Sequence, residues 1–176
     1  NVTYNTVGHC FFLEDGIETG NQFVRNLAIQ TKCHTSKPCV PTNLAPFGAT
    51  AGTNFNTTGQ DSKDVLIPSD NTVSSFWITN PENTYRDNVA AGSDATGFWF
   101  AFPEHPMGKF EGTEISRATW PRRTKFREFK GNVAHSNFDS FMGDRAPRAD
   151  GHFAVGGYIS LVNPADANSA QAESVV

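Results

Sequence analysis

Three ionisable side chains lie close together in the stretch GHCFFLEDG at residues 8–16, on either side of an aromatic pair. His9 precedes this pair, and Glu14 and Asp15 follow it. Glycoside hydrolysis needs two carboxyl groups a short distance apart, one acting as the acid and the other as the base or nucleophile. Glu14 and Asp15 therefore predict a catalytic site for polysaccharide cleavage. The alternative is that Asp15 and Gly16 merely form a turn, with Glu14 solvated beside it.

A second histidine, His135, lies in the stretch AHSNFDSF and is a further catalytic candidate. It follows Asn132 by three residues, much as His9 follows Asn5 by four. If the two asparagines mark equivalent turns of a repeat, the two histidines lie on nearby faces of different repeats. Histidine titrates near neutral pH, so such a pair would assist proton transfer or carry a positive charge. The alternative is a structural role for each ring.

The densest run of cations is RATWPRRTKFREFKGN at residues 117–132. An anionic polysaccharide is a natural partner for this strip, because arginine forks pair with carboxylates. Strand alternation predicts that Arg123, Lys125 and Arg127 share one face, spaced about 6–7 Å apart. The alternative is an exposed strand edge kept soluble by charge. The residues predicted here to bind substrate are Arg122, Arg123, Lys125, Arg127 and, as a stacking surface before them, Trp120.

Another aromatic candidate for substrate binding lies in the stretch GFWFAF at residues 97–102. Adjacent aromatic residues on a strand cannot all point inward, because successive side chains point to opposite faces. We predict that one ring faces outward, with Trp99 as the substrate-binding candidate. Either a loop covers this ring or the indole forms a platform on which a sugar ring stacks.

The elements that position these side chains follow from an internal repeat. Three segments share an aromatic residue, two spacers, an asparagine, an aliphatic residue and an alanine: FVRNLAIQT at 23–31, YRDNVAAGS at 85–93 and FKGNVAHSN at 129–137. Their asparagines are Asn26, Asn88 and Asn132, and a looser copy surrounds Asn5. The step from Asn5 to Asn26 is 21 residues and that from Asn88 to Asn132 is 44, which indicates a period of about 22.

This period predicts an all-β fold, a right-handed, single-stranded parallel β-helix of roughly six rungs. An asparagine at a fixed turn of each rung can adopt the left-handed backbone conformation, and its amide can bond to the asparagine of the next rung. Residues 33–72 are rich in Pro, Gly, Thr and Asn and lack periodicity, which predicts one long loop insertion. We expect the β-helix to span residues 1–162 and residues 163–176 to form a polar tail or linker.

The composition favours an extracellular β-protein. Only 18% of the residues are charged, and the net charge of −4 gives no reason to expect nucleic acid as a partner. No apolar run approaches the roughly 20 residues that a transmembrane helix needs. The chain lacks an initiating methionine and a visible capping rung, so we expect it to be part of a larger extracellular protein.

Cysteines and glycosylation sequons also bear on whether the protein is extracellular. Cys33 and Cys39 flank a polar stretch and predict a local disulfide, with two free thiols or a zinc site as the alternatives. Cys10 is predicted to be buried. Asn1 and Asn56 each begin an N-glycosylation sequon, which mildly supports secretion.

Several of these strings resemble the parallel β-helix region of the cell-surface hyaluronidase and fibrocystin-like family. They are GHCFFLEDGIETGNQFVRNLAI, SSFWITNPENTYRDNVAAGSDATGFWFAF and NVAHSN, and the resemblance is strong over residues 4–31, 74–102 and around 129–137. The resemblance implies a β-helix and an extracellular or cell-surface location. The family includes calcium-dependent hyaluronidases, so calcium is the one cofactor that the resemblance suggests. It places no family catalytic residue on this chain.

Two functions are therefore expected as alternatives. The first is a carbohydrate-related domain, part of a depolymerase of a hyaluronan-like glycosaminoglycan, which as an enzyme would be a glycoside hydrolase. The second is a non-catalytic β-helix segment of a large cell-surface or fibre protein. Carboxylates and a basic residue converging on one outward sheet would favour the first.

Overall fold

The computed structural model describes residues 1–33, 73–143, 146–147, 153–154 and 158–173. In this part of the chain, four successive coils add one strand each to a stack of parallel sheets. The strands, coil by coil, are β1 (Val2–Val7), β2 (Phe11–Phe12) and β3 (Gln22–Val24); β4 (Leu27–Lys32), β5 (Ser74–Ile78) and β6 (Thr84–Arg86); β7 (Val89–Ala91), β8 (Thr96–Phe100) and β9 (Glu128–Lys130); and β10 (Val133–His135) with β11 (Asp139–Met142).

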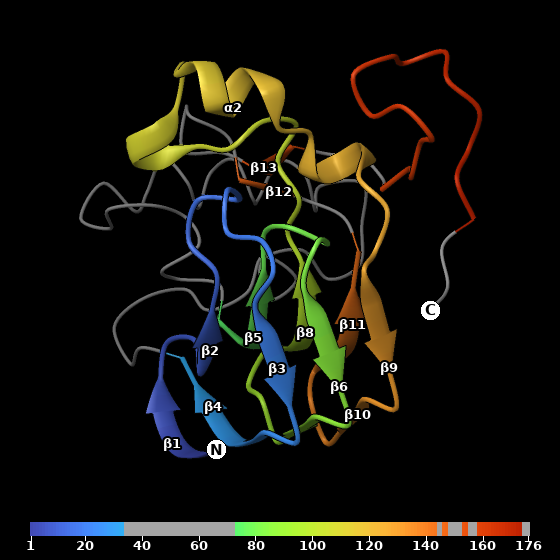
Figure 1. Cartoon of the computed structure of the whole chain (residues 1–176). Coiled ribbons are helices and arrows are strands. Elements are labelled where there is room, and N and C mark those ends of the chain that lie inside the picture. Colours follow the sequence, from blue (N-terminus) through green and yellow to red (C-terminus); the bar gives the residue numbers. More distant parts are fainter. Residues whose placement is uncertain (34–72, 144–145, 148–152, 155–157, 174–176) are drawn as a thin grey trace, which may run out of the picture.

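Three parallel sheets form the walls of the β-helix. Their strand orders are β1-β4-β7-β10, β2-β5-β8-β11 and β3-β6-β9, and every neighbouring pair within them is parallel. Figure 1 shows the coils side by side, from β1 at one end of the stack to β10 and β11 at the other. This arrangement confirms the predicted parallel β-helix architecture.

A ladder of asparagines joins the coils at the corner before the first sheet. The backbone N–H and the side-chain amide of Asn26 both donate to Oδ1 of Asn88, at 3.0 and 2.9 Å. Asn88 makes the same two bonds to Asn132, and Asn1 makes them to Asn26. Because Asn88 is fully buried, these bonds satisfy amides that have no access to water. The predicted ladder of Asn26, Asn88 and Asn132 is confirmed.

The left-handed backbone conformation lies one residue earlier than expected. Arg25, Asp87 and Gly131, which precede the ladder asparagines, have φ values of 54°, 55° and 66°. Asn5 is also left-handed, with φ 56°, but it lies at the next corner of the coil. Its place in the ladder is taken by Asn1, so the assignment of Asn5 to the repeat was wrong. The left-handed column at its corner contains Asn5, Gln30, Gly92 and Ser136.

Aromatic side chains fill the interior in columns parallel to the ladder. Phe11, Phe76, Phe98 and Phe141 contribute one ring per coil, and successive ring centroids lie 4.7, 4.5 and 5.4 Å apart with nearly parallel planes. Phe76 and Phe98 are inaccessible to solvent. The stacking follows from the register, because a parallel pairing without slip places identical positions of successive coils one above another.

A second insertion departs from the coils between β8 and β9. It contains the short 3-10 helices η3 (Gly108–Phe110) and η4 (Pro121–Arg123) and the helix α2 (Glu114–Ala118). Residues 158–173 pack against it, with Ile159 donating its N–H to the carbonyl of Arg122 and Leu161 donating to that of Arg123. We call residues 101–127 and 158–173 together the crown; Figure 1 shows it above the strands. A short antiparallel pair, β12 (Ala146–Pro147) and β13 (Phe153–Ala154), completes the described elements.

The second insertion corrects the predicted rung length and number. The ladder steps are 25 residues from Asn1 to Asn26, 62 from Asn26 to Asn88 and 44 from Asn88 to Asn132. The 44-residue step is therefore one coil carrying an insertion and not two coils of 22. The described chain forms four coils rather than six, and it carries the 101–127 insertion in addition to the segment 33–72.

Candidate functional site

His9 lies two residues before β2 and is held by the next coil. Its Nδ1 accepts the backbone N–H of Ser74 at 3.0 Å and lies 3.0 Å from the hydroxyl of the same residue. The ring packs between Phe12 and Trp77, at centroid distances of 5.3 and 4.8 Å. These contacts fix the imidazole as a bridge between the first two coils.

The pair Glu14–Asp15 lies after β2, below the crown. Both carboxylate oxygens of Glu18 accept backbone N–H groups of this bend, those of Asp15 and Gly16, at 3.1 and 2.9 Å. Burial raises the pKa of Asp15, the charges of Glu14 and Glu18 raise it further, and a backbone hydrogen bond from Lys109 opposes the rise. The geometry is that of the turn considered as the alternative to a catalytic pair.

The catalytic candidates do not converge. His135 is exposed on β10 in the fourth coil, where its Nδ1 lies 3.2 Å from the hydroxyl of Ser136. His9 belongs to the first coil and a different sheet, and three coil spacings of about 4.8 Å alone separate the two by roughly 14 Å. The two histidines therefore lie by different sheets and not on nearby faces of different repeats, as the sequence had predicted.

The basic strip is a 3-10 turn and a loop rather than a strand. Arg122 and Arg123 belong to η4, so the predicted alternation with Lys125 and Arg127 is wrong. Arg123 forms an ion pair with Glu104, and Arg122 lies 3.9 Å from the same carboxylate.

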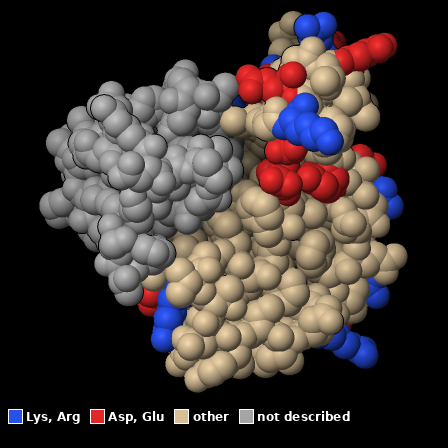
Figure 2. Space-filling view, turned by 90° about the vertical axis from the view of Figure 1, so that its left-hand side faces the viewer, with Lys and Arg blue, Asp and Glu red and all other residues tan. Residues whose placement is uncertain are grey.

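The remaining cations of the strip lie toward the coil. Arg127 pairs with Glu82 of the preceding coil at 3.3 Å, and Lys125 is exposed. Figure 2 views the molecule from the side of the first coil and shows charged side chains gathered toward the crown, above a surface that carries few charges.

Trp99 is buried, with 0% of its surface exposed. Its ring packs edge-on against Trp77 at 5.1 Å, and Ala101 and Met142 belong to the same buried cluster. Its predicted role as an open platform for a sugar conflicts with this burial. The covered outward ring considered as the alternative agrees with it.

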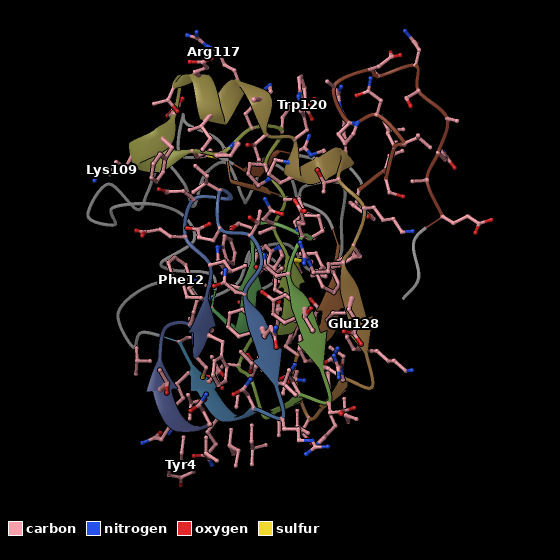
Figure 3. All side chains as sticks on the ribbon, in the orientation of Figure 1. Tyr4, Phe12, Lys109, Arg117, Trp120 and Glu128 are labelled. Atoms are coloured by element: carbon pink, nitrogen blue, oxygen red, sulfur yellow. The ribbon has the colours of Figure 1, made fainter. Side chains whose placement is uncertain are left out.

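Trp120, by contrast, lies at the surface of the crown in a cluster of functional groups (Figure 3). The guanidinium carbon of Arg123 lies 4.4 Å from the indole centroid, and the ring of His105 lies 3.9 Å away. Nδ1 of His105 lies 2.9 Å from the carbonyl oxygen of Thr119 and 3.1 Å from that of Ser116. Since both partners are acceptors, Nδ1 carries the proton.

A groove of about 400 Å³ lies beside this cluster. The bend after β2 and the corner before β6 form one side, α2 and the following residues form the second, and the 163–165 turn of the crown closes the third. The ion pair between Glu82 and Arg127 lies at this groove, because Glu82 is one of the lining residues. The groove is lined by Ile17, Thr19, Asn80, Glu82, Ile115, Ala118, Thr119, Trp120, Thr124, Asn163, Pro164 and Ala165.

The sequence analysis identified Trp120 and Arg127 but missed most of the groove. His105, Glu104 and Glu82 were not singled out, because they lie outside any repeated string. Charge balance could have pointed to Glu104 and Glu82, which form ion pairs with the cationic strip, since a strip of several cations seldom folds without nearby acids.

The remaining predicted sites lie partly outside the described residues. Cys39 and Asn56 lie outside the described residues, so the disulfide with Cys33 and the second sequon stay predictions. The side-chain amide of Asn1 donates to Asn26, and Sγ of Cys10 lies 3.2 Å from the hydroxyl of Thr31.

Calcium was the one cofactor suggested by the resemblance. Over the described ranges, no group of three or more His, Cys, Asp or Glu side chains is placed to hold a metal ion. Among the helices of the same part of the chain, none is long and apolar enough to cross a membrane.

Parallel coils, an asparagine ladder and a groove under an irregular crown define a parallel β-helix domain with one elaborated end. The family model named CEMIP beta-helix matches residues 1–142, from the first coil to the end of β11. The chain therefore belongs to the CEMIP β-helix family, as the resemblance predicted.

Its relatives include large proteins of two kinds. It is 35% identical over 142 residues to the human cell surface hyaluronidase CEMIP2, covering 78% of this chain and 9% of the relative. It is 37% identical to a zebrafish (Danio rerio) cell surface hyaluronidase, with the same coverage of 78% and 9%. It is 33% identical to mouse fibrocystin-L, covering 77% of this chain and 2% of the relative. The chain thus spans a small part of the length of these proteins.

Proposed function

We propose that this β-helix is a binding module of an extracellular or cell-surface protein and that it holds an acidic polysaccharide of the hyaluronan type in the groove beside Trp120. The observation that carries the proposal is the groove itself. An indole, three threonine side chains and an exposed guanidinium at one rim match the apolar faces, hydroxyls and carboxylates of such a chain. The names of two hyaluronidase relatives support the choice of ligand.

Binding is preferred to cleavage because the described carboxylates are not arranged for it. Glu18 is occupied as a cap, Asp15 rests in the bend, and Glu104 is paired with arginines. Among the described residues, Glu82 is the one carboxylate that lines the groove, and Arg127 is its partner. Hydrolysis by two carboxyl groups needs a second one facing it across the sugar.

The test compares two arginines in equivalent settings. Arg127 pairs with Glu82 at the groove, and Arg86 pairs with Glu128 on the β6–β9 sheet; their side chains are 51% and 48% exposed. We expect Arg127→Ser to weaken binding of hyaluronan oligosaccharides roughly fivefold or more at low salt, since a charge-assisted hydrogen bond contributes about 1–2 kcal/mol. Arg86→Ser should leave binding unchanged in the same calorimetric titration.

The proposal fails if the parent chain does not bind, or if both variants lose affinity equally. Labelled hyaluronan incubated with the chain, with and without a calcium chelator, should keep its length. Shortening of the labelled polymer would replace the binding proposal with the depolymerase expected as its alternative.

A second candidate is a structural coil stack without a ligand. The continuous ladder of buried asparagines favours it, because such a ladder lets a β-helix extend coil by coil. The relationship to fibrocystin-L is compatible with this role. It becomes the preferred function if the parent chain binds no acidic polysaccharide at low salt.

A further inference from the structure

Asn21 and Asn83 form a second asparagine ladder, at the corner before the third sheet. The backbone N–H and the side-chain amide of Asn21 donate to Oδ1 of Asn83 at 2.8 and 3.0 Å. These are the two bonds that Asn26 makes to Asn88 in the first ladder. Asn83 is fully buried, and its amide also donates to the carbonyl of Glu18 in the preceding coil. The second ladder therefore follows the bonding pattern of the first.

An arginine occupies the third position of this second ladder. The register of β6 on β9 aligns Arg127 with Asn83, and Figure 1 shows β3, β6 and β9 side by side. At the same step of the first ladder, the backbone N–H of Asn88 donates to Oδ1 of Asn132. A guanidinium has donors only, so it cannot accept the N–H of Asn83. Among the described residues, that buried N–H has no acceptor, and the second ladder stops at Asn83.

The contacts of Arg127 do not replace the lost hydrogen bond. Its guanidinium donates to Glu82 at 3.3 Å, but the two side chains are 51% and 48% exposed, and exposed ion pairs stabilise a protein little. A buried donor without an acceptor destabilises it more. The backbone N–H of Arg127 donates to the carbonyl of Pro81 at 3.0 Å, so this corner keeps its register whatever the side chain. Departures of this kind from a local structural rule are typical of functional positions.

The arginine brings a cation to the groove. Glu82 is a lining residue of the groove, and Arg127 is its ion-pair partner. Without the guanidinium, an acidic sugar chain in the groove would meet the carboxylate of Glu82 unpaired, and like charges repel. A neutral sugar chain would meet no such repulsion.

We infer that Arg127 is a specificity-determining residue, which stands in the place of a ladder asparagine and selects acidic over neutral sugar chains. The inference rests on the proposed function, because it concerns the same groove. It requires stability and selectivity to change in opposite directions at this position. An asparagine there completes the ladder and removes the selectivity.

Three replacements of Arg127 separate the two effects. Arg127→Asn supplies an acceptor for the N–H of Asn83, Arg127→Ala supplies neither an acceptor nor a charge, and Arg127→Lys keeps the charge without an acceptor. Thermal unfolding followed by circular dichroism measures stability. Calorimetric titration measures binding of hyaluronan oligosaccharides and of neutral N-acetylglucosamine oligosaccharides of the same length.

We expect Arg127→Asn to melt about 2–4 °C above both Arg127→Ala and the parent chain, because one buried N–H gains its acceptor. The Asn and Ala variants should bind hyaluronan oligosaccharides roughly fivefold more weakly than the parent and lose its preference for them over the neutral ones. Arg127→Lys should keep most of that preference, and salt should weaken it.

Two results would overturn the inference and leave the proposed function standing. One is a melting temperature of Arg127→Asn no higher than that of Arg127→Ala. The other is a parent chain that binds hyaluronan oligosaccharides while Arg127→Asn binds them with undiminished preference over the neutral ones. A parent chain that binds no hyaluronan would overturn the proposed function, and the selectivity assigned to Arg127 would fall with it.

Discussion

The coils and the crown of this molecule are stabilised in different ways. In the coils, one contact is repeated: asparagine over asparagine and ring over ring, with Asn88 and Phe98 fully buried. In the crown no contact occurs twice, and partly exposed groups such as Glu104 and Trp120 are held by ion pairs and ring contacts. Repetition concentrates stability in the coils. The crown, beside which the groove lies, has no repeated contacts that its sequence must preserve.

The largest loss of stability is expected in the aromatic column. Phe98→Ala removes a buried ring that stacks on both neighbouring coils, so we expect the free energy of unfolding to fall by about 3–5 kcal/mol. Urea denaturation followed by circular dichroism measures the change. Phe138→Ala is the matched control, because Phe138 is 47% exposed, and it should cost less than about 1 kcal/mol. Equal losses would show that the column is not the centre of stability.

The asparagine ladder should come next. Asn88→Ala leaves the buried backbone N–H and side-chain amide of Asn26 without their acceptor and removes the side-chain bond to Asn132. We expect a loss of about 2–4 kcal/mol, because a buried polar group without a partner costs about 1–3 kcal/mol. The same denaturation experiment applies. Asn168→Ala, at an exposed position in the crown, should change stability by less than about 0.5 kcal/mol.

Ion pairs of the crown should contribute less than either column. Glu104→Gln removes the carboxylate charge shared by Arg122 and Arg123, and we expect a loss of about 0.5–1 kcal/mol that shrinks in high salt. Glu111→Gln, on the exposed side of the crown, serves as the control. A loss from Glu104→Gln as large as that from Asn88→Ala would erase the contrast between the two regions.

The smallest effect concerns Asp15 and depends on pH. Its pKa is raised in the folded protein, chiefly by burial, so the folded state binds a proton more tightly than the unfolded state does. The resulting stabilisation is fully present below the ordinary pKa of 3.8 and is lost as the pH rises through the raised value. Asp15→Asn should therefore raise the melting temperature slightly at pH 7 and leave it unchanged at low pH. A lower melting temperature at pH 7 would contradict this.

The difference between the two regions also explains what could be predicted. Asn26, Asn88 and Asn132 share the same neighbours, and their repetition was enough to predict the parallel β-helix and the ladder. The coil length was not predictable in the same way, because an insertion of 101–127 makes one coil look like two. Asn5 was taken for Asn1 because the two asparagines lie only four residues apart and both occupy turns.

The groove was harder to predict than the fold. Its walls come from four separate stretches, and no sequence period relates Ile17, Glu82, Trp120 and Pro164. Charge density pointed to Arg123 and Arg127 but could not show that they form ion pairs with Glu104 and Glu82. The sequence also could not show which tryptophan is open to a ligand, because Trp99 and Trp120 are the same type of residue and differ only in burial.

The unequal ladder steps have a consequence for how such a chain can change in length. Closing a flexible loop costs entropy that grows only with the logarithm of its length. Lengthening a step from 25 to 62 residues therefore costs about 0.8 kcal/mol, less than one well-made pair of ladder bonds contributes. A β-helix of this kind can gain or lose whole surface loops between strands while its coil-to-coil register stays the same, so new surfaces can arise without a new scaffold.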